Sequence, residues 1–212
     1  MQEQNPIVLM NFSGIYREEE FWKNRQVSWI ELQDVCGTNC YCDEEAIAEI
    51  NKRTENYPTA ESILLIPVNY HYMTRLWLTR MDQPFCLLVY DNHTDMQPPA
   101  LVDLSCGGWI AAALEELENL KYVILVGPDE AAYEQVDENL KDRVIFLSRE
   151  KLQVMMMKRE TGFSGKQSVK YVIGENRKVY RKMLKNSFHY IYLLIKMCFV
   201  QRMHRRHGAR GI

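Results

Sequence analysis

A short acidic run, Asp91-Asn92-His93-Thr94-Asp95, combines aspartate and histidine, two common metal ligands in proteins. The run directly follows the apolar segment 85–90. In an extended chain alternate side chains point to the same side, so Asp91, His93 and Asp95 can converge. Two carboxylates and one imidazole are suitable ligands for a divalent ion such as Mn²⁺, whereas a thiolate-type zinc site needs cysteine ligands. The run therefore predicts a metal site at a strand end.

Other interpretations of the same residue types stay open. Asp, Asn and Thr side chains also bond nearby backbone groups, so a run of them is typical of a turn after a strand. Cys36, Cys40 and Cys42 could hold a metal, but they lack a C-x-x-C pair, and we favour reduced thiols over structural zinc. Cys106 precedes a Gly-Gly pair and is interpreted as a small buried cysteine rather than an activated thiol.

Composition predicts a globular domain. The chain has 212 residues, of which 47% are hydrophobic, enough to bury a full core. The formal net charge of -2 gives the whole chain no attraction to nucleic acid or to an anionic membrane. The first residues form neither a basic leader nor an apolar segment, so we expect a cytoplasmic protein without a signal peptide.

Strand-like and helix-like segments alternate along the chain, and this order positions the acidic run. Near-continuous apolar strands separated by helices indicate a mainly parallel sheet covered on both faces, a three-layer α/β/α architecture. Ligands of such sheets bind at the carboxyl ends of the strands, where the acidic run would lie. The expected strands are 6–12, 62–66, 85–90, 121–128 and 143–147, and the expected helices are 43–50, 73–81 and 109–117.

Several motifs resemble one enzyme superfamily. The segment 85–97 resembles the first metal motif of the arginase, agmatinase and deacetylase-like ureohydrolases, and His71 in the segment 69–72 resembles their earlier single histidine ligand. The segments 37–42 and 104–109 are similar to a small bacterial arginase-like branch. The resemblance covers roughly residues 5–180 and implies the α/β/α fold of this superfamily.

The resemblance implies a chemistry and a ligand set. Ureohydrolases hydrolyse a guanidino carbon with a hydroxide that bridges two Mn²⁺ ions, so the implied substrate is a small guanidino compound or an arginine-containing peptide. Carried over by position, His71 and Asp95 are ligands of one ion, His93 is a ligand of the other, and Asp91 is a bridging carboxylate. The same acidic run, Asp91, His93 and Asp95, is then the catalytic group.

The resemblance also indicates where substrate would bind. Gln97, Asp103 and Ser105 are the expected substrate contacts. Arginases have a further histidine a short way past the acidic motif, whereas this region of the chain holds Asp103, Ser105 and Cys106. The general acid is therefore unassigned.

The carboxyl-terminal part departs from the family. Ureohydrolases complete their metal pair with a second strand-end motif of the type Ser-Ile-Asp-x-Asp, but the segment 152–212 has no Asp, and Glu160 and Glu175 are its only carboxylates. An apolar segment, 188–200, and a basic segment, 201–212, stand there instead. The apolar segment contains Lys196 and is too short to span a membrane, which needs about 20 apolar residues. A short basic segment of this kind is typical of a solvated tail, and we favour that interpretation over a nucleic-acid-binding arm.

We interpret the missing motif by the hypothesis of a displaced reading frame, which the genetic code permits. If Leu193 to Cys198 are encoded by CTA TTG ATA AAG ATG TGT, the frame displaced by one base reads Ile-Asp-Lys-Asp-Val. We therefore expect an arginase-like domain over 1–184, C-terminally incomplete, followed by an altered apolar segment and basic tail over 185–212, with its apolar part filling the place of the lost strand. This predicts one bound Mn²⁺ or none, and low or absent turnover. A non-catalytic binding protein of the same fold is the alternative, and nucleic-acid binding through the tail is the third.

Overall fold

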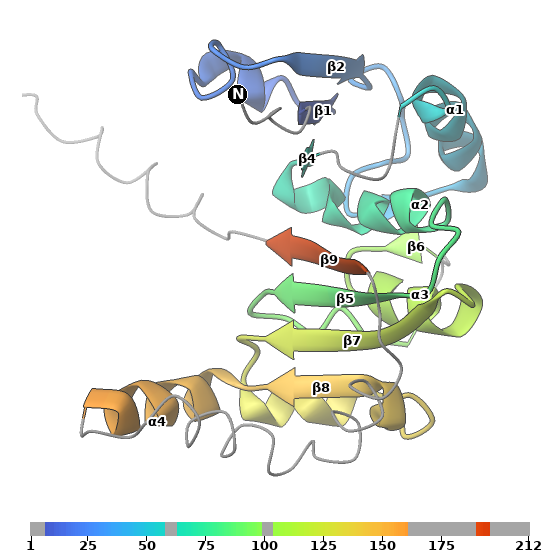
Figure 1. Ribbon diagram of the computed structural model, residues 1–212. Coiled ribbons are helices and arrows are strands. Elements are labelled where there is room, and N and C mark those ends of the chain that lie inside the picture. Colours follow the sequence, from blue (N-terminus) through green and yellow to red (C-terminus); the bar gives the residue numbers. More distant parts are fainter. Residues whose placement is uncertain (1–6, 58–62, 99–103, 161–189, 196–212) are drawn as a thin grey trace, which may run out of the picture.

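The computed structural model describes residues 7–57, 63–98, 104–160 and 190–195. Its strands form three sheets, of which two are parallel and one is a short antiparallel ribbon (Figure 1). The first sheet has the order β2-β1-β4, with β1 at Ile7–Asn11, β2 at Val27–Glu31 and β4 at Ile63–Leu65. The second has the order β8-β7-β5-β9, with β5 at Phe85–Tyr90, β7 at Leu120–Val126, β8 at Val144–Leu147 and β9 at Tyr190–Ile195. The ribbon pairs β3 at Tyr41–Cys42 with β6 at Leu104–Ser105.

Helices connect these strands. The α-helices are α1 at Glu44–Thr54, α2 at Thr74–Leu78, α3 at Trp109–Glu116 and α4 at Arg149–Glu160. Short 3-10 helices are η1 at Ile15–Glu18, η2 at Val68–Met73, η3 at Glu130–Gln135 and η4 at Lys141–Arg143. Asp43 begins α1 as its N-cap, because its side chain accepts the Ala46 N–H at 2.8 Å. None of the helices in the described ranges is long and apolar enough to cross a membrane.

One hydrophobic core joins the two parallel sheets. It contains Met10 of β1, Leu87 of β5, Trp77 of α2 and Trp109 of α3, all buried. The opposite face of the second sheet carries a smaller cluster of Cys86, Tyr122 and Ile145, to which no helix residue belongs within the described part of the chain. The fold is therefore α/β with parallel strands, and α3 packs against β7 on the core side of the second sheet.

Most of the expected elements are confirmed. The five expected strands coincide with β1, β4, β5, β7 and β8, and the expected helices coincide with α1, α2 and α3, although α2 is shorter than the predicted helix 73–81. Patterning missed β2, the β3-β6 ribbon and α4. The apolar segment 188–200 contributes β9, which pairs with β5 in parallel, so a strand does stand beside β5. The rest of the altered segment and the basic tail lie outside the described residues, as does Asp103.

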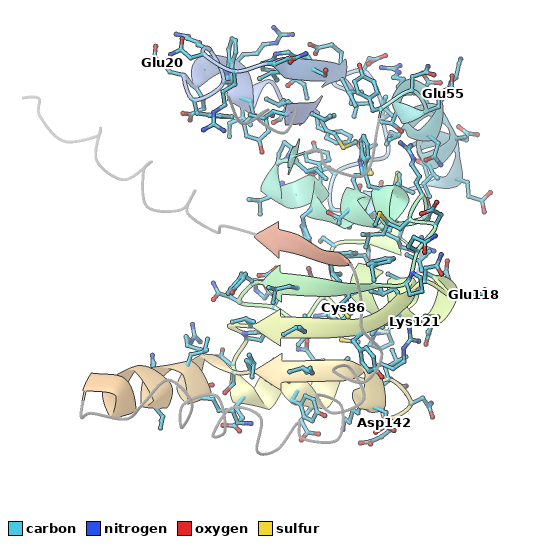
Figure 2. The ribbon with its side chains drawn as sticks, viewed as in Figure 1. Glu20, Glu55, Cys86, Glu118, Lys121 and Asp142 are labelled. Carbon is cyan, nitrogen blue, oxygen red and sulfur yellow. The ribbon has the colours of Figure 1, made fainter. Side chains whose placement is uncertain are left out.

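The carboxyl ends of the second sheet all lie at one edge. The arrowheads of β5, β7, β8 and β9 point the same way in Figure 1. Figure 2 shows Glu118 and Lys121 near the amino end of β7, at the opposite edge. The acidic run follows β5 at the carboxyl edge, where parallel sheets bind their ligands.

Candidate metal centre

Three buried side chains meet at the carboxyl end of β5. Asp91 follows β5 directly, Asp95 lies four residues further on, and His71 comes from η2 after β4. One ligand atom from each of the three residues lies within 4.8 Å of the others. Within the described residues this is the one group of His, Cys, Asp or Glu side chains that could hold a metal ion. The structure therefore brings together three of the four ligands that the sequence predicts.

Each of the two ring nitrogens of His71 lies close to oxygen atoms. Its Nδ1 lies 2.5 Å from the Val68 carbonyl, and its Nε2 lies 2.8 Å from Asp95 Oδ2 and 3.2 Å from the Cys106 carbonyl. A neutral imidazole has one N–H, so only a doubly protonated ring donates to both sides. A metal ion at Nε2 would take the role of the second proton, with Nδ1–H donating to Val68 in the manner of metal-bound histidines.

Asp95 is held from two directions by the beginning of α3. The Trp109 indole N–H donates to Asp95 Oδ2 at 3.0 Å, and the Ile110 N–H donates to the Asp95 carbonyl at 3.0 Å. Asp95 also has a left-handed backbone with φ 50°, a conformation that aspartate tolerates better than most residues. These contacts aim its carboxylate at His71. Sequence patterning had assigned no role to Trp109.

His93 lies beside this group rather than within it. Its side chain is 66% exposed, and its Nδ1 is 3.4 Å from Asp91 Oδ1. The chain turns here, because the His93 N–H donates to Asp91 Oδ1 at 3.1 Å. The alternation expected of an extended run is therefore broken. Asp91 and Asp95 converge through the turn, and His93 contacts Asp91 from the solvent side.

The expected substrate contacts border the turn before α3. The Gln97 N–H donates to the Gly107 carbonyl at 2.9 Å, and the side chain of Gln97 is exposed. A Cβ at Gly108 would stand 2.7 Å from the Gln97 carbonyl and 3.7 Å from Ser105 Oγ. Gln97 and Ser105 are thus near one another, next to the chain that carries Trp109.

Gly127 allows the end of β7 to pass close to Asp91. Its φ is 114°, and a Cβ there would stand 2.7 Å from the Asp91 carbonyl oxygen. The backbone of Asp91 is also tied to β7, because its N–H donates to the Val126 carbonyl at 3.1 Å. A side chain at position 127 would therefore push directly on the residue that carries the carboxylate.

Substituting Gly127→Ala is expected to lower the free energy of unfolding by at least about 2 kcal/mol, through the strained φ and the clash with Asp91. It should also weaken Mn²⁺ binding. Gly14→Ala is the matched control, since Gly14 has φ 76° but meets only the side chain of Gln33. Urea denaturation and Mn²⁺ titration of both variants measure the difference. If the two variants lost the same stability and both kept the wild-type Mn²⁺ affinity, the role of Gly127 would be contradicted.

Substituting Trp109→Phe is expected to reduce Mn²⁺ affinity about tenfold, because the Asp95 carboxylate loses the donor that orients it. Trp77→Phe is the matched control. Trp77 is equally buried, but its indole N–H donates to Met10 Sδ, away from the site. Both variants should lose stability, and only Trp109→Phe should lose affinity in calorimetry. A comparable loss of affinity in Trp77→Phe would show that general loosening of the core explains the effect.

Comparisons with known proteins do not assign a family. No protein-family model matches the chain, and no solved structure matches it significantly. A protein of Thermotoga maritima, described as an uncharacterized protein, is 28% identical over 124 residues. The match covers 58% of this chain and 49% of that protein, so it spans about half of the relative's length. This likeness brings no activity with it.

Proposed function

We propose that this chain is an arginase-like metallohydrolase whose buried site holds a single Mn²⁺, and that its turnover of guanidino C–N bonds is low or absent. One observation carries the proposal. Two carboxylates and one histidine meet in a buried group at the carboxyl end of a parallel strand, with ligand atoms within 4.8 Å. His71, Asp91 and Asp95 are the proposed ligands of the ion.

The burial of the carboxylates supports a cation. The side chains of Asp91, Asp95 and His71 are 1%, 4% and 6% exposed. Placing ionised carboxylates out of water is costly unless a charge of opposite sign compensates them. The buried His71 can offset one carboxylate, and the exposed His93 beside Asp91 contributes little because solvent screens it. A divalent ion compensates both, and the mixture of oxygen and imidazole ligands suits Mn²⁺.

A second ion would bind poorly in this chain. His93 is close enough to Asp91 to share an ion with it, at 3.4 Å between Nδ1 and Oδ1. Two cations would then rest on two carboxylates and two imidazoles, which leaves their mutual repulsion poorly neutralised. The sequence has no Asp after Asp142 that could supply a second bridging carboxylate. We infer that one ion is the occupied state.

The substrate class follows from the same groups. A bound divalent ion lowers the pKa of a water ligand and so supplies hydroxide near neutral pH. Because Asp91 and Asp95 are used to hold the ion, Gln97 and Ser105, which border the turn before α3, are the proposed contacts of a guanidino group. A small guanidino compound or an arginine-containing peptide is the proposed substrate class.

The finer architecture is part of the proposal. In the order β8-β7-β5-β9 the chain steps from β5 to β7 to β8 and then returns to the other side of β5. When right-handed crossover connections run in opposite directions along a parallel sheet, the connecting segments lie on opposite faces of that sheet. This topology supports the three-layer α/β/α arrangement of the ureohydrolases.

The proposal is tested by Mn²⁺ titration and by urea release from arginine and from an arginyl peptide. We expect one bound ion per chain and urea at or near background. His93→Ala should keep the affinity within about threefold, whereas His71→Ala should lose at least tenfold, because only His71 belongs to the buried group. Rapid urea release, or equal binding by all three proteins, would contradict the proposal.

A further inference from the structure

Two cysteines adjoin the β3-β6 ribbon beside the candidate metal centre, and their backbones are hydrogen-bonded to each other. The register pairs Tyr41 with Ser105, so one step along it brings Cys40 opposite Cys106. The Cys106 N–H donates to the Cys40 carbonyl at 2.8 Å, and the ladder ends at this bond, because Cys40 has a left-handed backbone with φ 64°. Opposed residues of an antiparallel pair have Cα atoms about 4.5–5.5 Å apart, and the bond between the two backbones places Cys40 and Cys106 near that range. A disulfide needs a separation of roughly 4.4–6.8 Å.

We propose that Cys40 and Cys106 form a reversible disulfide, which makes the ribbon an oxidation site next to the metal centre. Both residues are thiols in the structure. Cys40 is exposed and Cys106 is partly buried, so a small oxidant reaches Cys40 first. This inference goes beyond the proposed function and does not depend on a bound metal.

The other described cysteines are poorer partners. Cys42 is buried, and burial raises the pKa of its thiol to about 12, with a smaller contribution from Asp43, so it stays protonated. Cys86 is buried on β5 in the second hydrophobic cluster, and burial raises the pKa of its thiol to about 11 (Figure 2). Cys36 is exposed but lies before the ribbon, where the register gives it no facing cysteine.

The proposed oxidant is a low-molecular-weight disulfide such as glutathione disulfide. The Cys40 thiolate attacks one sulfur of the small disulfide, whose S–S bond breaks and releases one thiolate. The Cys106 thiolate then attacks the Cys40 sulfur, forming the protein disulfide and releasing the second small thiolate. Two electrons pass from the protein to the small disulfide, and the two protons of the protein thiols end on the released thiols.

The position of the pair links it to His71. The Cys106 carbonyl lies 3.2 Å from His71 Nε2, and the Cys40 N–H donates to the Asn69 carbonyl at 3.0 Å, two residues before His71. Tyr72 adds a further tie, because its hydroxyl donates to the Tyr41 carbonyl at 2.6 Å. A bond between the two sulfurs would therefore restrain the backbone on both sides of this histidine.

The test is oxidation of the full chain with glutathione disulfide, followed by peptide mass spectrometry without reduction. We expect one cross-linked peptide pair that joins Cys40 to Cys106, and a melting temperature raised by roughly 5–10 °C, because the bond closes a long loop. Reduction with dithiothreitol should reverse both changes. Cys36→Ser should retain the cross-link, whereas Cys106→Ser and Cys40→Ser should each abolish it.

Two outcomes would overturn the inference. One is a cross-link that joins Cys36 to Cys40 and leaves Cys106 reduced. The other is a stable glutathione adduct on Cys40 that Cys106 does not resolve. Because Cys40 is exposed, Cys40→Ser provides a folded reference even if Cys106→Ser is poorly stable.

Discussion

Substituting Asp95→Asn is expected to lower Mn²⁺ affinity at least about 100-fold, or about 2.8 kcal/mol. The amide keeps the shape of the carboxylate and can still accept the Trp109 indole N–H, but it removes one of the two buried negative charges. Stability in the presence of EDTA should change little or rise, because the metal-free state then buries less uncompensated charge. Isothermal titration calorimetry and thermal melting measure the two effects.

Asp82→Asn is the control for this prediction. Asp82 is an exposed carboxylate just before β5, at the opposite end of the strand from the site. The two variants have the same change in charge, so long-range electrostatics affects both and direct ligation affects only Asp95→Asn. Equal Mn²⁺ affinities in the two variants would remove Asp95 from the ligand set.

The double substitution Ile195→Asp with Met197→Asp is expected to raise the bound Mn²⁺ from one to two ions per chain and to yield urea release from a guanidino substrate. β9 pairs with β5 so that Ile195 stands opposite Tyr90, the residue before Asp91. Position 195 thus lies at the carboxyl edge of the sheet, opposite the residue before Asp91. The two substitutions also create the Asp-Lys-Asp order of the displaced reading frame, with Lys196 already in place.

Two controls separate charge from ligation in this experiment. Ile195→Asn with Met197→Asn has the same polarity without the charge, and it should bind one ion and release no urea. Adding His93→Ala to the double Asp variant should remove the second ion only, because His93 contacts Asp91 from the solvent side. A double Asp variant that folds, binds one ion and stays inactive would contradict the proposed ancestry of the site.

Sequence patterning predicted the buried elements best. The strands β5 and β7 are apolar along nearly their whole length, most of their residues are buried, and such runs are distinctive. The strand β2 was missed because it is half-exposed, with a mixed Val-Ser-Trp-Ile-Glu pattern. The β3-β6 ribbon has two residues in each strand, so its pairing depends on tertiary contacts that no local pattern reveals.

The site was predicted in its residue types and only partly in its geometry. Asp91 and Asp95 are buried near one another, and a turn brings them together, so the interpretation of the acidic run as a turn is confirmed and its role as a metal site stays a prediction. Patterning favoured His93 over His71, because His93 lies between the carboxylates in sequence. The buried group contains His71, which a distant element supplies. Trp109 and Gly127 act through contacts of the folded chain, and the sequence alone gave no signal for either.

The proposed function depends on the binding of a divalent ion by the buried group of His71, Asp91 and Asp95. Electron paramagnetic resonance of free Mn²⁺ during titration of the chain measures it most directly, because the sharp signal of the free ion is lost on binding. We predict saturation at one ion per chain, reversal by EDTA, and no saturable binding in the same concentration range by His71→Ala. A free-ion signal that rises without saturation in the wild-type chain, or unchanged binding by His71→Ala, would contradict the account.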